Sequence, residues 1–272
     1  MEFSVLMSVY DKESPQFLRE CLESIQQQSL QPDEIVIVED GPINEALQSV
    51  LSEFREELPI VSVRLSQNRG LGDALNEGLE RCRHDLVARM DTDDHCRPGR
   101  FALQVAYMDA HSDIDMLGGA IAEFDEDPAR PHAIRELPTG SDNVARFARS
   151  RSPVNHMTVM FRRRAILEAG GYQRFLGMED YYLWARMLCR GSRIDNVSDI
   201  LVNARVGNGM LTRRRGWSYF KQDVRLQQKF REMGFINQTT MIKNICQRAP
   251  LRLLPEKALG LLYQRVLRKK PT

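Results

Sequence analysis

Apolar and polar residues alternate in a regular way through the first 124 positions of the chain. Short apolar runs typical of buried strands lie at 3–9, 34–38, 60–65, 86–90 and 116–124. The segments between these runs are predicted to be helices, at 15–28, 44–57, 73–83 and 100–110. Strands that alternate with helices at this interval predict βαβ units, and therefore an α/β fold with a parallel central sheet.

The alternation weakens beyond residue 124. Residues 125–140 are rich in acids and prolines, so we expect a mobile loop there that orders over a bound substrate. The pattern then predicts a helix at 141–149, a strand at 155–161 and a helix at 181–189. From Trp217 onward the sequence is helical and basic, which indicates a helical extension behind the α/β domain.

The net charge of +1 conceals a marked asymmetry between the two parts of the chain. Residues 201–272 hold 16 Lys or Arg and 3 Asp or Glu, whereas residues 1–200 hold 22 and 34. A basic segment of this kind can contact nucleic acid, an anionic membrane or a pyrophosphate, or it can be a helical extension with a solvated basic face. No nucleic-acid-reading motif accompanies it, so we expect no nucleic-acid partner.

The cysteines and the hydropathy of the chain bear on its compartment. The five cysteines are odd in number and show neither a zinc spacing nor a disulfide framework. No run of about 18 apolar residues occurs, and the first 27 residues do not resemble a secretion signal. We therefore expect a cytosolic protein that does not span a membrane.

Three carboxylates crowd the turn after the apolar run 86–90, at Asp91, Asp93 and Asp94. Open α/β sheets place their ligands where strands end, and crowded carboxylates repel one another unless a cation is present. Hard oxygen ligands suit Mg²⁺ or Mn²⁺, and Mg²⁺ is usually held by one or two carboxylates together with substrate phosphates. The turn thus predicts a metal and a phosphate-bearing substrate; the alternative is an acidic turn that caps the helix starting near Pro98.

The spacing of several motifs resembles that of the inverting family 2 glycosyltransferases with a GT-A fold. The motifs are Ser8-Val9-Tyr10, Val38-Glu39-Asp40-Gly41, Asn68-Arg69-Gly70-Leu71 with Ala74 and Asn76, Asp91-Thr92-Asp93-Asp94, and Gly177-Met178-Glu179-Asp180-Tyr181-Tyr182-Leu183-Trp184. The resemblance covers residues 3 to about 206. It implies a Rossmann-like, mostly parallel sheet flanked by helices, with a nucleotide-sugar-binding and catalytic domain at 1–210 and a basic helical extension at 211–272.

The resemblance also implies roles on the donor side of the site. Ser8 and Tyr10 begin the nucleotide pocket, Glu39 accepts hydrogen bonds from a uracil base, Asp91 reaches the ribose and Asp93 holds the metal. Asp94 orients the waters of the metal or caps the next helix. Asn68 and Arg69 lie at a predicted helix N-terminus, a position that favours an anion, although Arg69 can equally be a surface cation.

On the acceptor side, the resemblance makes Asp180 the base that takes the proton of the attacking hydroxyl. Glu179 and Trp184, in the same motif, are expected to contact the acceptor or to support it, although the acidic pair can also simply start the helix favourably. His156 is expected to face the substrate, with a structural role as the alternative. Some family members carry a later histidine that residues 205–210 lack, which leaves metal ligands beyond Asp93 open.

Within the family, Glu39-Asp40-Gly41-Pro42, residues 155–161 and residues 205–209 resemble bacterial transferases of O-antigen and exopolysaccharide assembly, of the amylovoran type. This resemblance implies transfer of glucose or galactose from a UDP-sugar to a sugar on undecaprenyl diphosphate, with Mn²⁺ or Mg²⁺ as cofactor. The basic extension, densest at Arg213-Arg214-Arg215, would then rest on the anionic inner face of the cytoplasmic membrane. The alternatives are direct transfer to polyprenyl phosphate and a non-catalytic nucleotide-sugar-binding scaffold in a membrane assembly.

Overall fold

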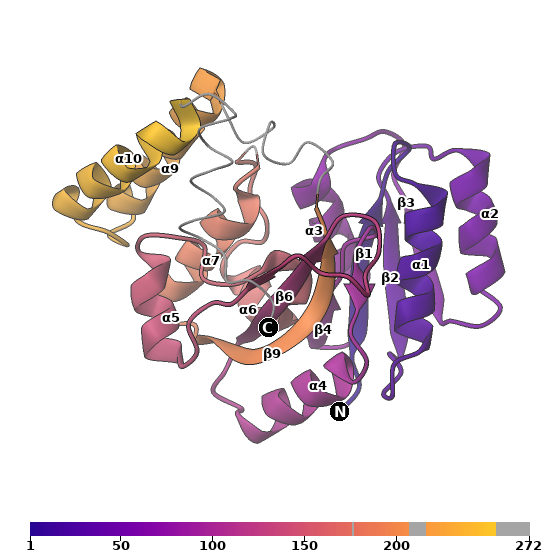
Figure 1. The fold of residues 1–272 in the computed structure, drawn as a ribbon. Coiled ribbons are helices and arrows are strands. Elements are labelled where there is room, and N and C mark those ends of the chain that lie inside the picture. Colours follow the sequence, from indigo (N-terminus) through magenta and orange to yellow (C-terminus); the bar gives the residue numbers. More distant parts are fainter. Residues whose placement is uncertain (176, 207–215, 254–272) are drawn as a thin grey trace.

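The computed structural model describes residues 1–175, 177–206 and 216–253 (Figure 1). Its strands belong to one nine-stranded sheet: β1 Ser4–Val9, β2 Glu34–Glu39, β3 Ile60–Arg64, β4 Leu86–Arg89, β5 His95–Cys96, β6 Met116–Phe124, β7 Ala133–Arg135, β8 Met160–Arg162 and β9 Ile194–Arg205. Its α-helices are α1 Pro15–Gln26, α2 Glu45–Phe54, α3 Leu71–Arg81, α4 Arg100–Ala110, α5 Ser141–Ala148, α6 Arg163–Glu168, α7 Glu179–Cys189, α9 Gly216–Glu232 and α10 Gln238–Leu253.

The strands lie in the order β3-β2-β1-β4-β8-β6-β9-β5, and β7 pairs with β6 outside this path. The four strands from β3 to β4 are parallel, whereas β8 is antiparallel to both of its neighbours. Beyond β8 the long strands β6 and β9 are again parallel. The α/β fold class predicted from the sequence is confirmed, with a mixed sheet whose first half is wholly parallel.

Helices cover both faces of the sheet because successive side chains of each strand point to opposite faces. In β1, Val5, Met7 and Val9 pack in the cluster that holds the apolar residues of α1, α2 and α4. Leu6 points to the other side and packs in the cluster that holds those of α3, α6 and α7. Both clusters are fully buried over β1, so this strand lies at the centre of the molecule.

The loop between β2 and α2 touches the loop before α3, and this contact shapes the site. Both carboxylate oxygens of Asp40 accept backbone N–H groups, from Arg69 at 2.7 Å and Gly70 at 3.0 Å. Gly41 has a φ of +87°, and a Cβ there would lie 2.6 Å from the backbone nitrogen of Asn68. Only glycine fits that position, so the end of β2 and the start of α3 are fixed together.

Three segments differ from the sequence prediction. The strand predicted at 155–161 is wrong in its first half, where His156–Thr158 forms a 3₁₀ turn before β8. The segment 125–140, predicted to be a loop, includes β7, which pairs with β6. The twelve-residue strand β9 was not predicted, because its central Asn196, Ser198 and Asp199 interrupt the apolar pattern.

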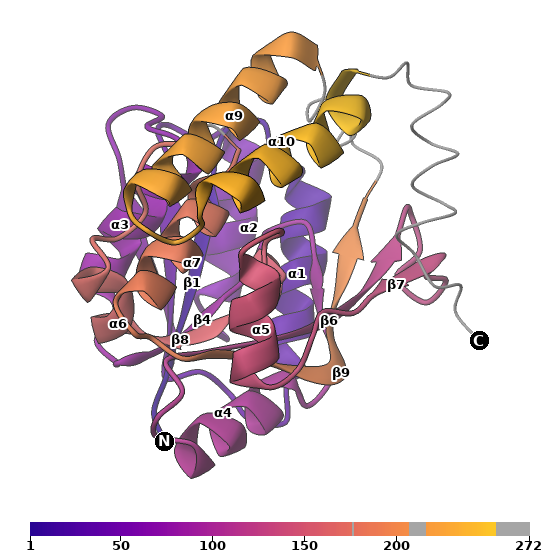
Figure 2. The ribbon, with the colours of Figure 1, turned by 90° about the vertical axis from the view of Figure 1, so that its left-hand side faces the viewer.

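Helices α9 and α10 pack side by side on the outer side of α7, away from the sheet (Figure 2). Leu226 and Phe230 of α9 join Tyr181 and Ala185 of α7 in a third apolar cluster. None of the described helices is both long and apolar enough to cross a membrane. The boundary predicted at residue 210, the Arg213-Arg214-Arg215 run and residues 254–272 lie outside the described residues, and the division into two domains stays a prediction.

Candidate active site

The acidic turn lies between the end of β4 and the start of β5. One ligand oxygen from each of Asp91, Asp93 and Asp94 falls within 4.8 Å of the others. Asp94 is buried, and the other two carboxylates are half-buried. The parallel strands β1 and β2 end beside β4, so the turn sits at the carboxyl edge of the sheet, where α/β folds bind ligands.

A buried arginine faces the turn from inside the sheet. Arg89, the last residue of β4, is 2% exposed and pairs through both terminal nitrogens with the carboxylate of Asp91. A bidentate pair of this kind fixes the orientation of the carboxylate. Asp91 is therefore held toward Arg89, whereas Asp93 and Asp94 are not paired with it.

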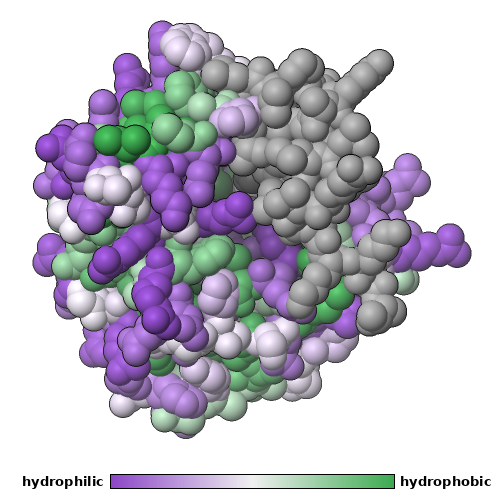
Figure 3. All heavy atoms as spheres, turned by 60° about the vertical axis from the view of Figure 1, so that its left-hand side comes forward, coloured by the Kyte–Doolittle hydropathy of each residue, from purple (hydrophilic) through white to green (hydrophobic). Residues whose placement is uncertain are grey.

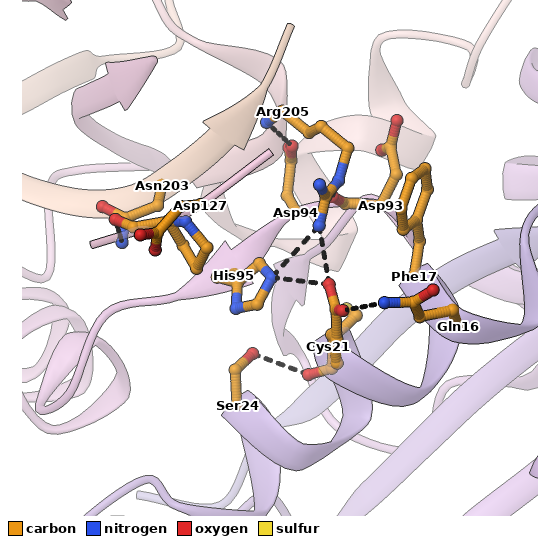
Figure 4. A network of polar contacts seen from close by, with 12 residues as sticks. Gln16, Phe17, Cys21, Ser24, Asp93, Asp94, His95, Asp127, Asn203 and Arg205 are labelled. Carbon is orange, nitrogen blue, oxygen red and sulfur yellow. Dashed lines mark hydrogen bonds and ion pairs between the residues drawn. The ribbon is translucent and has the colours of Figure 1, made fainter. Parts of the chain in front are cut away.

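A second arginine fastens the turn to the end of β9 (Figure 4). The backbone N–H of Arg205 donates to Asp94 Oδ1 at 2.8 Å, and its Nε donates to the carbonyl of Asp93 at 3.2 Å. Its Nη2 contacts Glu20 Oε2 at 2.6 Å, and its guanidinium lies over the ring of Phe17, 3.8 Å from the centroid. One side chain thus joins α1, the acidic turn and β9.

The acidic turn has the chemistry of a cation site. Burial and the charge of Asp91 raise the pKa of Asp93 to about 6, and the same causes raise the pKa of Asp94 well above its usual range. Oδ2 of Asp94 is buried and accepts no hydrogen bond from the described residues. A divalent cation would offset the repulsion between these carboxylates and would give Oδ2 of Asp94 a partner. The residues present therefore fit Mn²⁺ or Mg²⁺.

The residues predicted to bind the nucleotide cluster at the ends of β1 and β2. Ser8 is half-buried, and Tyr10 lies just past β1 with 37% of its surface exposed. Glu39 is buried at the end of β2, where it accepts hydrogen bonds from Gln48 at 3.0 Å and from Arg64 at 3.2 Å.

Asn68 and Arg69, predicted to face an anion, lie in the loop before α3. Asn68 donates to the carbonyl of Asp40 at 3.2 Å, and Arg69 pairs with Glu77 at 2.6 Å. Asp40, the residue before Gly41, holds the backbone of this loop.

Glu179 and Asp180 form the first turn of α7, which begins two residues before the helix predicted at 181–189. Both side chains are half-buried, and burial raises the pKa of Glu179, with the charge of Asp180 adding to the effect. Gly72 at the start of α3 faces Glu179: a Cβ on this glycine would lie 3.5 Å from Glu179 Cγ. The starts of α3 and α7 therefore meet at the acidic pair.

An aromatic cluster lies between the acidic turn and α7. Tyr172 Oη and His156 Nε2 are 2.8 Å apart, and both rings pack edge-on against Trp184, which is fully buried. Asn76 of α3 fixes the backbone of Tyr172 through two hydrogen bonds of 2.8 Å. Burial, followed by the charge of Arg89, lowers the pKa of His156 well below its usual range, so this imidazole is neutral.

Tyr172 connects the two acidic groups electrostatically. Burial raises its pKa, and the charges of Asp180 and Asp91 both add to the rise. A Cβ on Gly72 would lie 3.4 Å from Tyr172 Cβ and 3.5 Å from Glu179 Cγ, so Tyr172 lies beside the start of α7. The structure thus brings the two predicted halves of the site together around His156 and Tyr172.

Four residues of the site were missed by sequence reasoning: Arg89, Tyr172, Arg205 and Glu20. Arg89 left a signal, because a charge within the apolar run 86–90 needs a buried partner. Tyr172 follows Gly170-Gly171, and this sequence indicates only the end of a helix. Arg205 begins the segment 205–209, but its contact with Glu20 gave no signal, since 185 positions separate the two residues in the sequence.

Curated proteins of high similarity cover nearly the whole chain. The amylovoran biosynthesis glycosyltransferase AmsE of Erwinia amylovora is 45% identical over 97% of this chain and 98% of its own length. An Escherichia coli protein described as UDP-Gal:alpha-D-GlcNAc-diphosphoundecaprenol beta-1,3-galactosyltransferase is 37% identical over 98% of this chain and 97% of its own length.

Solved structures and a family model agree on the fold. The structure of S. aureus TarS 1–349 in complex with UDP-GlcNAc has a TM-score of 0.70 and is 19% identical, over 98% of this chain and 76% of the TarS chain. In another S. aureus TarS structure the match covers 46% of the TarS chain. Mannosyltransferase PcManGT of Pyrobaculum calidifontis, with GDP-Man and Mn²⁺, has a TM-score of 0.64 and 18% identity over 95% of this chain and 72% of its own. The model described as "Glycosyl transferase family 2" matches residues 4–171, and the chain belongs to this family of glycosyltransferases.

Proposed function

We propose that the protein is an inverting hexosyltransferase of bacterial O-antigen or exopolysaccharide assembly. It moves glucose or galactose from a UDP-sugar to a sugar carried on undecaprenyl diphosphate. The name of the E. coli relative, 37% identical over nearly the full length, supports this donor and acceptor class, and galactose is the first donor to test.

The observation that carries the proposal is the presence of two separate acidic groups near Tyr172. The turn at 91–94 has the features of a cation and diphosphate site, and the pair at 179–180 starts the helix whose Trp184 packs against His156 and Tyr172. Inverting transfer needs this division, because the leaving group and the attacking hydroxyl occupy opposite faces of the donor sugar.

On the leaving-group side, Asp93 would hold the metal, Asp91 would reach the ribose and Asp94 would orient metal-bound water. The bound Mn²⁺ or Mg²⁺ supplies positive charge that stabilises the departing diphosphate. Arg89 and Arg205 keep these carboxylates in place, since one pairs with Asp91 and the other binds the turn at Asp93 and Asp94. Ser8, Tyr10 and Glu39 would receive the nucleoside, and Asn68 and Arg69 an anionic group beside it.

On the acceptor side, Asp180 would act as the general base. The acceptor hydroxyl attacks the anomeric carbon, Asp180 takes its proton, and the bond from that carbon to the diphosphate breaks with the electron pair leaving on UDP. Glu179 would hydrogen-bond the acceptor from the same turn, while neutral His156 presents its ring beside the reacting sugars. Trp184, fully buried behind them, would support the two rings.

The proposal extends to location: residues 211–272 would rest on the anionic inner face of the bacterial cytoplasmic membrane. In the described part of this segment, Trp217 is 58% exposed and has the ammonium of Lys221 5.9 Å from its ring centroid. An exposed tryptophan beside basic side chains suits a headgroup layer. Partition to anionic liposomes at low salt, with release at high salt, is the expected result; no binding at low salt would contradict it.

The catalytic proposal is tested with Asp180→Asn, and with Asp109→Asn as a matched control on the exposed end of α4. The Asp180 variant should bind UDP-galactose as the wild type does and lose turnover on the order of 10²-fold or more. The control should keep wild-type turnover. Turnover close to wild type in Asp180→Asn, with donor binding intact, would exclude this base.

A further inference from the structure

A recess of about 520 Å³ opens beside the first turn of α7. Its walls come from the start of α3, the loop at Arg174 and Phe175, Glu179 of α7, and Gln222 and Arg225 of α9. None of the three carboxylates of the acidic turn lines it. The recess is therefore separate from the acidic turn and lies beside the helix turn that holds Asp180.

Three arginines line this recess, Arg69, Arg174 and Arg225, and they outnumber its two acids, Asp73 and Glu179. Arg174 pairs with Asp73 at 2.6 Å, but its side chain is 77% exposed, and an ion pair so exposed contributes little and exchanges partners easily. Arg225 is exposed and forms no ion pair with any described residue. Guanidinium forks bind phosphate oxygens in pairs, so the recess suits an anion with several oxygens.

The packing of α9 against α7 fixes the position of Arg225. The next residue, Leu226, is fully buried against α7. Earlier on the same helix, Tyr219 Oη donates to the carbonyl of Gly177, 3.4 Å away, in the loop before α7. These contacts hold α9 so that Gln222 and Arg225 complete the recess, which gives the C-terminal helices a part in the site.

We propose that this recess binds the diphosphate of the acceptor, with Arg174 and Arg225 as its two principal ligands. The inference rests on the proposed function, in which the acceptor sugar is linked to a diphosphate. A single sugar ring separates the attacking hydroxyl from that diphosphate. The recess lies at the right place for it, because Glu179 lines the wall and the general base Asp180 is the next residue.

The test compares two synthetic acceptors that carry the same sugar and the same alkyl chain. One is linked through a diphosphate and the other through a neutral ether. The variants are Arg174→Gln and Arg225→Gln, and the control is Arg231→Gln, an exposed arginine of α9 outside the recess. Circular dichroism checks that each variant folds.

For the diphosphate acceptor, each recess variant should raise KM about tenfold, the scale of one charge-assisted hydrogen bond. For the ether acceptor, the KM of the variants should differ far less from that of the wild type. The control variant should have the wild-type KM for both acceptors. Equal effects on the two acceptors, or none on either, would overturn the inference. A rise in KM for the UDP-sugar alone would overturn it as well, since the recess would then serve the donor.

Failure of the proposed function would give a different experimental result from failure of the inference about the recess. A wild-type protein that releases UDP from the donor but transfers to no lipid-linked acceptor would overturn the acceptor class, and the inference with it. A wild-type protein that transfers to the diphosphate acceptor, with variants that keep the wild-type preference for the diphosphate over the ether acceptor, would overturn only the role of the recess.

Discussion

Arg205 links three parts of the site, so its replacement by glutamine should affect both stability and metal response. Its side chain is 5% exposed, and its partner Glu20 is 27% exposed. The change removes the 2.6 Å contact to Glu20, the bond to the carbonyl of Asp93 and the packing of the guanidinium on Phe17.

The magnitude follows from burial. Breaking a fully buried ion pair costs about 3–5 kcal/mol, and the partial exposure of Glu20 reduces this to about 3 kcal/mol. For a protein of this size that loss lowers Tm by roughly 6–12 °C. The backbone N–H to Asp94 survives the substitution, so the acidic turn should loosen but remain formed.

A double-mutant cycle with Glu20→Gln and Arg205→Gln isolates the pair. We expect a coupling of about 1.5–3 kcal/mol by chemical denaturation. The control is the pair Arg19 and Glu53, where Arg19 neighbours Glu20 on α1 and the side chains are 37% and 55% exposed. That pair should couple much more weakly, because solvent screens it.

The metal response completes the test. Arg205→Gln should require more Mn²⁺ for half-maximal activity, because the carbonyl of Asp93 loses its tether to β9. Loss of a positive charge alone would act the other way and favour cation binding. A coupling no larger than that of the control pair, or an unchanged or lower Mn²⁺ requirement, would refute the positioning role of Arg205.

Three further predictions concern the metal and the packing. EDTA should abolish transfer and added Mn²⁺ restore it, whereas Asp93→Asn should stay inactive at any Mn²⁺ concentration; full activity of the treated wild type would contradict this. Gly78→Ala should lower the free energy of unfolding by about 1–3 kcal/mol in urea, because a Cβ there would lie 2.3 Å from Leu6 Cδ1 and 2.8 Å from Val38 Cγ2; a neutral change would count against the tight contact of α3 with the sheet. Phe230→Ala should cost about 3–5 kcal/mol and expose α9 to limited proteolysis, since Phe230 is fully buried between α7 and α9; unchanged proteolysis would show that α9 does not depend on this contact.

Much of the parallel half of the fold could be predicted because its strands carry a continuous apolar signal. In β2 every residue is buried, and the sequence there is apolar between Glu34 and Glu39. Strand β9 escaped prediction because its middle is exposed and polar, at Ser198 and Asp199. The ladder with β6 makes it a strand, and pairing partners far along the chain leave no local pattern.

The candidate site shows the same division between local and distant signals. The acidic turn and the pair Glu179 and Asp180 could be picked out because each lies in a short motif. The contacts that place them could not, since the salt bridge of Arg205 and the hydrogen bonds between Asn76 and Tyr172 join residues 185 and 96 positions apart. The recess at Arg225 likewise exists only because α9 folds back onto α7.

The surface bears on how the acceptor reaches the site. On the face shown in Figure 3 hydrophilic side chains predominate, and the apolar ones form separate patches between them. Trp217 and Ile242, on α9 and α10, are among the large apolar side chains left exposed. These two side chains are candidates for contact with the lipid part of the proposed acceptor.

The central claim is a single inverting displacement from a UDP-hexose onto a lipid-diphosphate-linked sugar. The most direct measurement is the anomeric configuration of the product, determined by NMR after transfer from UDP-galactose in the presence of Mn²⁺. UDP-galactose carries an α-linked sugar, so inversion should give a β-linked galactose on the acceptor sugar. An α-linked product, or galactose attached directly to polyprenyl phosphate, would contradict it.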